Sequence, residues 1–173
     1  KPEPYFYKGA KENTLFLGIE LEVEGTGKIG EKAEEMVDEF DASERHFYLK
    51  EDSSLENGFE VVSHPHTLLK HKEYRWNDII NYLYEKQFTS YDNTRCGLHI
   101  HFNRDALGKR HRTQDRHILR LINFFHNNQE EITDFSRREI PQILQWCKFS
   151  EKSYTDIEEY GYFDRYMAVN ILN

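Results

Sequence analysis

The segment 96–103 reads Cys-Gly-Leu-His-Ile-His-Phe-Asn and alternates apolar side chains with His99 and His101. Successive side chains of a strand point to opposite faces, so both imidazoles share one face, roughly 7 Å apart at about 3.3 Å rise per residue. Neutral imidazole is a good metal ligand, and its charge changes near pH 7. The pattern indicates a ligand site, although an amphipathic strand with a solvated His-x-His face needs no ligand.

A second strand of the same design is expected in the segment 14–24, which reads Thr-Leu-Phe-Leu-Gly-Ile-Glu-Leu-Glu-Val-Glu. Apolar residues form one face, and Glu20, Glu22 and Glu24 fall on the other. Glutamate is disfavoured in strands, and like charges on one face repel one another. A cation between them would remove this repulsion, and hard cations such as Mg²⁺ take carboxylate oxygen ligands. A water-facing strand whose glutamates keep the sheet soluble explains the same pattern.

Two further carboxylates, Asp52 and Glu60, belong to the segment 52–63. The sequence neighbours of Glu60 are apolar, so its carboxylate faces away from them. If this strand lies beside the glutamate strand, Glu60 joins Glu20 and Glu22 around one or two cations. The alternatives are a turn-capping role for Asp52 and, for Glu60, a cross-strand ion pair with a lysine.

The other histidines have no comparable spacing. His64 and His66 flank Pro65 and are expected to be loop residues rather than ligands. The remaining five are expected at the surface: His46, His71, His111, His117 and His126.

The composition suits a folded protein with a hydrophobic core. A chain of 173 residues with 38% hydrophobic and 31% charged residues is long and apolar enough for one globular domain. The formal net charge of -8 argues against general nucleic-acid binding, which needs a basic surface. It allows a small anionic ligand such as a nucleotide, whose phosphates a bound cation can neutralise.

Two cysteines, Cys96 and Cys147, form neither a disulfide framework nor a CxxC motif, which favours a reducing compartment. No apolar run approaches membrane-spanning length, and no signal peptide is visible. We therefore expect a cytoplasmic protein with no membrane segment. The sequence does not give its oligomeric state.

Strands and helices alternate along the chain without repeats or linkers. Strands are expected at 14–24, 46–49, 59–63 and 96–103, and helices at about 33–40, from about 67 to 83, and from an N-cap at Thr113. The two-faced strands suit an antiparallel sheet backed by helices on one side. The chain is therefore predicted to be a single α+β domain over residues 1–173.

Taken in order, these motifs resemble the amidoligase family of the glutamine synthetase-like superfamily, which occurs in phage and bacterial genomes. The resemblance runs from about Leu15 to Asn170, and the Cys-Gly-Leu-His-Ile-His block is its most specific part. The matching blocks are Gly18-Ile-Glu-Leu-Glu, Asp52-Ser-Ser-Leu, Gly58-Phe-Glu-Val-Val-Ser, Cys96-Gly-Leu-His-Ile-His, Ser136-Arg137-Arg138 and Arg165-Tyr-Met-Ala-Val-Asn170.

The resemblance implies an ATP-dependent carboxylate–amine ligase, in which ATP phosphorylates a carboxylate and an amine displaces the phosphate from the acyl phosphate. It implies a curved antiparallel sheet with the site on its concave face. Glu20, Glu22 and Glu60 would then hold Mg²⁺ or Mn²⁺, with His99 as a further metal ligand and His101 on the nucleotide phosphates. Imidazole is a softer ligand than Mg²⁺ usually selects, which brings Mn²⁺ into consideration.

The resemblance also assigns roles outside the metal ligands. Arg165 and Arg138 are candidates for binding a carboxylate or phosphate, because guanidinium matches these anions bidentately. A solvated arginine or a surface salt bridge is the alternative for each. Asn170 would orient the substrate, and Asp52 is a further candidate catalytic residue. The substrates would be a carboxylate and an amine, each a small molecule or a peptide.

One departure from the family concerns the C-terminal end. Family members continue past the Arg…Asn block into a Glu-Phe-Arg-type strand, which this sequence lacks before its last residue, Asn173. We expect either a truncated chain or the loss of part of the site. Three hypotheses follow: an amide-forming ligase, an inactive nucleotide- or metal-binding or interaction module on the same fold, and a metal-dependent hydrolase that uses the glutamate and histidine cluster.

Overall fold

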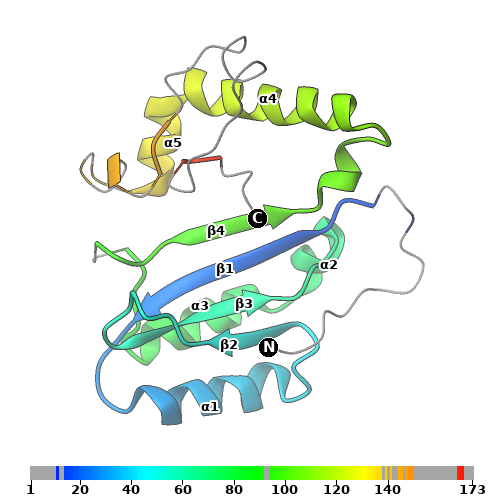
Figure 1. Ribbon diagram of the computed structural model, residues 1–173. Coiled ribbons are helices and arrows are strands. Elements are labelled where there is room, and N and C mark those ends of the chain that lie inside the picture. Colours follow the sequence, from blue (N-terminus) through cyan, green and yellow to red (C-terminus); the bar gives the residue numbers. More distant parts are fainter. Residues whose placement is uncertain are drawn as a thin grey trace. The chain divides into compact units, whose positions relative to one another are not determined.

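Four antiparallel strands form one open sheet in the first of the two units into which the chain divides, 1–106 and 107–173 (Figure 1). The computed structural model describes residues 11, 14–91, 94–137, 139, 141, 144–145, 147–149 and 167–169. In spatial order the strands are β2 (Phe47–Lys50), β3 (Gly58–Ser63), β1 (Leu17–Glu24) and β4 (Leu98–Phe102). Helices back this sheet, so the predicted α+β class is confirmed.

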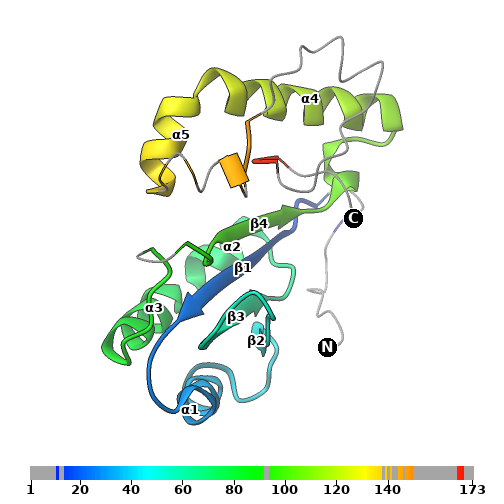
Figure 2. The same cartoon turned by 60° about the vertical axis from the view of Figure 1, so that its left-hand side comes forward.

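Helices α1 (Ile29–Asp41) and α3 (Trp76–Glu85) pack against one face of the sheet, and the short α2 (Leu68–Glu73) precedes α3 (Figure 2). The core between strands and helices consists of Val23, Met36, Phe47, Phe59, Val61, Ile79, Tyr82, Leu83 and Phe88. Burying a large apolar side chain contributes roughly 1.5–3 kcal/mol. This core therefore decides which face of β1, β2 and β3 turns inward, and the alternate residues of these strands turn away from the helices.

The apolar face predicted for β4 is present but is not part of this core. Leu98, Ile100 and Phe102 alternate with the two histidines, and they are 54%, 60% and 37% exposed. In the described sheet β4 is an edge strand, paired with β1 alone.

Residues 67–83 form two helices where the sequence predicted one. The chain breaks at Tyr74, whose backbone is extended at φ −83°, ψ 155°. The Tyr74 hydroxyl donates to the carbonyl of Phe40, and the ring of Trp76 stacks on that of His71 with centroids 5.9 Å apart. Tertiary contacts of these aromatic side chains outweigh the helical periodicity.

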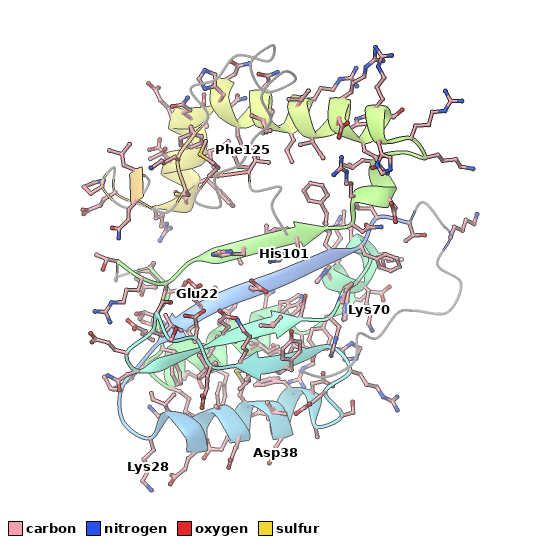
Figure 3. The ribbon with its side chains drawn as sticks, in the orientation of Figure 1. Glu22, Lys28, Asp38, Lys70, His101 and Phe125 are labelled. Carbon is pink, nitrogen blue, oxygen red and sulfur yellow. The ribbon has the colours of Figure 1, made fainter. Side chains whose placement is uncertain are left out.

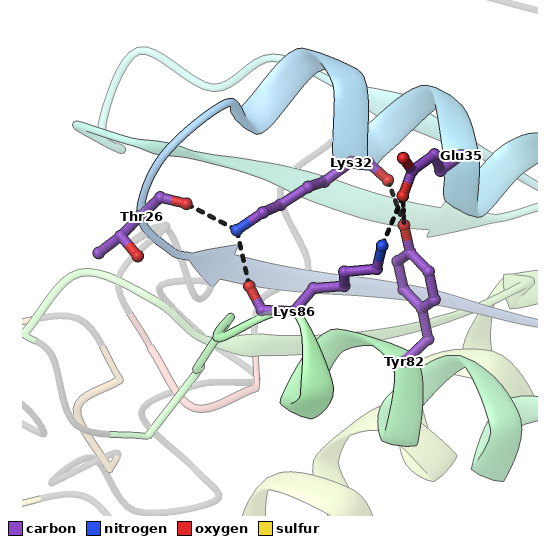
Figure 4. A network of polar contacts seen from close by, with 5 residues as sticks. All are labelled: Thr26, Lys32, Glu35, Tyr82 and Lys86. Atoms are coloured by element: carbon purple, nitrogen blue, oxygen red, sulfur yellow. Dashed lines mark hydrogen bonds and ion pairs between the residues drawn. The ribbon is translucent and has the colours of Figure 1, made fainter.

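A polar network joins α1 to the end of α3 (Figure 4). The Lys32 ammonium donates to the carbonyls of Thr26 (2.7 Å) and Lys86 (2.9 Å). The Tyr82 hydroxyl donates to the Lys32 carbonyl (2.8 Å), and the Lys86 ammonium forms an ion pair with Glu35 (2.6 Å). The network fixes the two helices side by side on the inner face of the sheet.

The second unit contains helices α4 (His111–Asn127) and α5 (Gln129–Ser136). Its buried cluster consists of Ile118, Leu119, Ile122 and Val169. The N-cap predicted at Thr113 is wrong, because α4 begins at His111 with Arg110 as its N-cap. Among the described residues, no helix is both long and apolar enough to cross a membrane.

A row of histidine rings lies beside the start of β1. The centroids of His46 and His66 are 5.5 Å apart, and those of His66 and His71 are 5.1 Å apart. The prediction that His71 is a surface residue is wrong: it is buried, and its Nε2 donates to the Leu17 carbonyl at 2.9 Å. His64 follows β3 in a loop, as predicted, whereas His66 forms a β-bridge with Leu17, and both histidines are buried.

We predict that this row destabilises the protein at mildly acidic pH. Burial lowers the pKa of His66 from 6.5 to about 4, and burial also lowers the pKa of His46. Because the unfolded chain binds these protons near pH 6.5 and the folded protein does not, the free energy of unfolding falls as pH decreases from 6.5 towards 4. The contribution of His66 is at most about 1.4 kcal/mol per pH unit. Urea unfolding between pH 7.5 and 5.0 measures this slope.

Two variants separate His66 from other titrating groups. His66→Gln keeps a polar side chain that cannot be protonated, and its slope between pH 6.5 and 5.0 should be flatter than that of the wild type. His117→Gln removes an exposed histidine on α4 and should keep the wild-type slope. Equal slopes in all three proteins would show that His66 is not the source.

Candidate functional site

The outer face of the sheet, opposite α1 and α3, collects charged and titratable residues from all four strands. In the strand register Glu22 lies opposite Glu60 on β3, and Glu20 lies opposite His99 on β4. Residues directly opposite in an antiparallel pair project from the same face. Glu22 on β1 and His101 on β4 are labelled in Figure 3. The face predicted from each strand separately is thus one continuous surface.

The histidines of β4 lean over the glutamates of β1. His101 Nε2 is 3.1 Å from Glu20 Oε2, and His99 Nε2 is 4.0 Å from Glu22 Oε1. The hydrogen bond from His101 lowers the pKa of Glu20, against the opposing effect of partial burial. Glu20 is therefore ionised at neutral pH, as a metal ligand must be.

A second group of carboxylates lies further from the edge, where Glu22 meets Asp52 and Glu60. Hydrogen bonds with Glu60 and Ser54 lower the pKa of Asp52 to about 2. Burial raises the pKa of Glu60, whose side chain is only 5% exposed, and the hydrogen bond with Asp52 adds to this. The Asp52 carboxyl is therefore ionised at neutral pH, whereas the buried surroundings of Glu60 disfavour the charged form of its carboxyl.

Both alternatives that the sequence left open for these two residues are present as well. Asp52 Oδ1 accepts a hydrogen bond from the Ser54 backbone at 2.6 Å, which is the turn-capping role. Glu60 Oε2 forms an ion pair with Lys50 at 2.7 Å, which is the cross-strand pair with a lysine. Neither contact uses all the oxygens of these carboxyl groups, so the structural roles are compatible with a ligand role.

Lys50 is the residue of this face that the sequence did not single out. It ends β2 and lies opposite Glu60 in the register of β2 and β3. The hydrogen bond with Glu60 raises the pKa of Lys50, and the charges of Glu20 and Asp52 add to the effect. The sequence indicated that a lysine could pair with Glu60 across the strands. Which lysine it is depends on the register of β2 and β3, which the sequence alone does not give.

The third glutamate of β1 is not part of either group. Glu24 Oε1 accepts a hydrogen bond from the Glu56 backbone at 2.7 Å and holds the loop before β3. That loop ends at Gly58, where any side chain would collide with the Val23 carbonyl. Glu24 therefore stabilises the loop that carries Asp52. Of the three glutamates of β1, Glu20 and Glu22 remain as candidate metal ligands.

The side chains form two groups with the donor atoms of a metal site. Each group has three ligand atoms within 4.8 Å of one another: Glu20, His99 and His101 in one, and Glu22, Asp52 and Glu60 in the other. The all-carboxylate group matches the oxygen ligands of Mg²⁺ or Mn²⁺, whereas the group with two imidazoles suits softer divalent cations. The crowding of acidic groups against one lysine favours a bound cation on this face.

The other predicted site residues are not placed. Arg138, Arg165 and Asn170 lie outside the described residues. Their roles in binding a carboxylate or phosphate and in orienting a substrate stay predictions.

Comparison of the chain with models of known protein families, with curated proteins and with solved structures gives no match in any of the three. Fold and site together define an α+β protein with two groups of candidate metal ligands on the open face of its sheet.

We predict that the carboxylates of this face destabilise the metal-free protein. Like charges directly opposite in a sheet cost about 0.2–1 kcal/mol, so Glu22→Gln should raise Tm in EDTA. For a protein of this size 1 kcal/mol corresponds to roughly 2–4 °C. The same change should reduce the increase in Tm that Mg²⁺ or Mn²⁺ produces, because one ligand is lost. Thermal unfolding with EDTA and with each cation measures both effects.

Glu34→Gln is the matched control, since it removes the same charge from an exposed position of α1. It should leave the cation-dependent shift in Tm at the wild-type value. A lower Tm of Glu22→Gln in EDTA would contradict the repulsion argument.

Proposed function

We propose that the chain is an ATP- and divalent-metal-dependent carboxylate–amine ligase with a glutamine synthetase-like fold, whose site lies on the concave face of a curved sheet. Two lines support this proposal. The order of the sequence blocks resembles the amidoligase family, and the metal-compatible residues of four of those blocks come together in two groups. We also propose a cytoplasmic location, which agrees with two cysteines that form no disulfide.

The observation that carries the proposal is the register across β3, β1 and β4. Glu60 and Glu22 are directly opposed, and so are Glu20 and His99. Strands from distant parts of the sequence thus bring carboxylates and imidazoles within ligand distance of one another. A surface kept charged only for solubility has no need of two glutamates directly opposite each other, because such a like-charge pair costs stability.

In the proposed reaction a substrate carboxylate oxygen attacks the γ-phosphorus of ATP, ADP leaves, and an acyl phosphate forms. The amine nitrogen of the second substrate then attacks the acyl carbon, inorganic phosphate leaves, and the nitrogen gives up a proton. A bound Mg²⁺ or Mn²⁺ would neutralise phosphate charge during the transfer. The substrates are a carboxylate and an amine, each a small molecule or a peptide.

The residues of the face have distinct proposed tasks. Glu22 and Glu60 would hold one cation together with Asp52, and Glu20 and His99 would hold a second. His101 would donate to phosphate oxygens of the nucleotide once Glu20 is engaged by metal. The tasks proposed for the remaining residues, Arg138, Arg165 and Asn170, are to bind the carboxylate or phosphate and to orient the substrate.

We predict that the protein forms acyl phosphates that hydroxylamine can trap. With Mg²⁺, ATP and a panel of amino acids and dicarboxylates, the expected products are a hydroxamate and an equal amount of ADP. Glu20→Gln and His99→Ala should each lower the rate at least tenfold, because each removes a metal ligand. Coloured ferric hydroxamate and coupled ADP detection provide the two measurements.

Glu34→Gln on α1 is the control and should react like the wild type. ADP formation that continues unchanged in Glu20→Gln and His99→Ala would contradict the ligase assignment. ADP formation without hydroxamate from any carboxylate would point to a simple ATPase.

A metal-dependent hydrolase is the second candidate function. Glu20, His99 and His101 combine one carboxylate with two half-exposed imidazoles, a donor set that catalytic zinc uses with a fourth position left for water. This candidate predicts about one Zn²⁺ per purified chain, ester or peptide hydrolysis without ATP, and loss of both in His101→Ala. Metal analysis of the purified protein and ATP-free hydrolysis assays separate it from the ligase.

A further inference from the structure

Lys50 occupies the position from which a cation would bind the buried carboxylates. Its ammonium is 2.7 Å from Glu60 Oε2, and its side chain is 49% exposed while that of Glu60 is 5% exposed. Its charge also acts on Glu20 and Asp52, which belong to the two candidate ligand groups. The positive charge of Lys50 thus partly neutralises several carboxylates of this face.

The ammonium and a divalent cation compete for the same carboxyl group. Mg²⁺ and Mn²⁺ bind carboxylate oxygens at about 2.1 Å, so a cation held by Glu22, Asp52 and Glu60 must bind the carboxyl group that Lys50 contacts. Two positive charges this close repel each other strongly. The Lys50 side chain can leave without disturbing the sheet, since it stands on the edge strand β2 and is half exposed.

We propose that Lys50 is an internal counterion that a divalent cation displaces, and that the displaced ammonium then binds an anionic oxygen of the ligand that the cation recruits. The inference rests on the metal site of the proposed function and adds to it an order of binding, cation first and anion second. Lysine suits the second role, because a flexible ammonium is a common point-charge partner of phosphate oxygens.

The exchange has opposite consequences for the two ligands. Without the Lys50 charge the carboxylates should bind a cation more tightly, because its competitor is gone. The anion should bind more weakly, because one positive partner is missing. A lysine that only stabilises the fold would change neither affinity in this opposed manner.

The test measures Mn²⁺ alone and then inorganic pyrophosphate at saturating Mn²⁺, both by calorimetry at pH 8. Lys50→Met keeps the length of the side chain without its charge. On the order of tenfold tighter Mn²⁺ binding is expected from Coulomb's law for a unit charge near a divalent ion. Pyrophosphate binding should be weaker by a similar factor, and Lys50→Arg should stay near the wild type in both titrations.

Lys28→Met is the control for net charge, because Lys28 pairs with Glu31 on the exposed side of α1. It should leave both affinities unchanged. If Lys50→Met binds Mn²⁺ no more tightly than the wild type, or binds pyrophosphate equally well, the inference is wrong while the metal site stands. If the wild type binds no Mn²⁺, the metal site and the proposed function fail as well.

Discussion

Burial of the inner face of β1 is the constraint on which the rest of the site depends. Val23 lies in the core with Phe59 and Val61 of β3, and this packing fixes which half of the β1 side chains turns towards the helices. Because side chains alternate along a strand, the other half of the β1 side chains must point to the opposite face of the sheet. Glu20 and Glu22 are therefore held on the open face by apolar contacts in which they take no part.

The same constraint brings glutamates close together on the outer face. Their charges are balanced by one kind of partner near β4 and by another near β2. Near β4 the partners are imidazoles, which lower the pKa of Glu20. Near β2 they are the Lys50 ammonium, which forms an ion pair with Glu60, and a hydrogen bond between Asp52 and Glu60 that lowers the pKa of Asp52. Glu22 directly opposite Glu60 is still a like-charge pair, and such a pair costs stability.

Much of this arrangement is readable from the sequence, and the reasons for the rest are physical. Alternation alone predicted the polar faces of β1 and β4, because the period of a strand is two whatever its partners are. The pairing of Lys50 with Glu60 depends on the β2–β3 register, which alternation does not specify. The break at Tyr74 and the burial of His66 and His71 arise from ring packing between distant segments, which leaves no periodic signal in the sequence.

The position of β1 between β3 and β4 has a consequence for the order of folding. β1 is the first described strand along the chain, yet both of its neighbours are synthesised later, and β4 comes last. Loop closure over such separations is slow compared with helix formation. During synthesis the edge of β1 that pairs with β4 therefore keeps its backbone N–H and C=O groups unpaired until β4 emerges. A nascent chain that stops before residue 98 would carry the acidic ligands without the imidazoles.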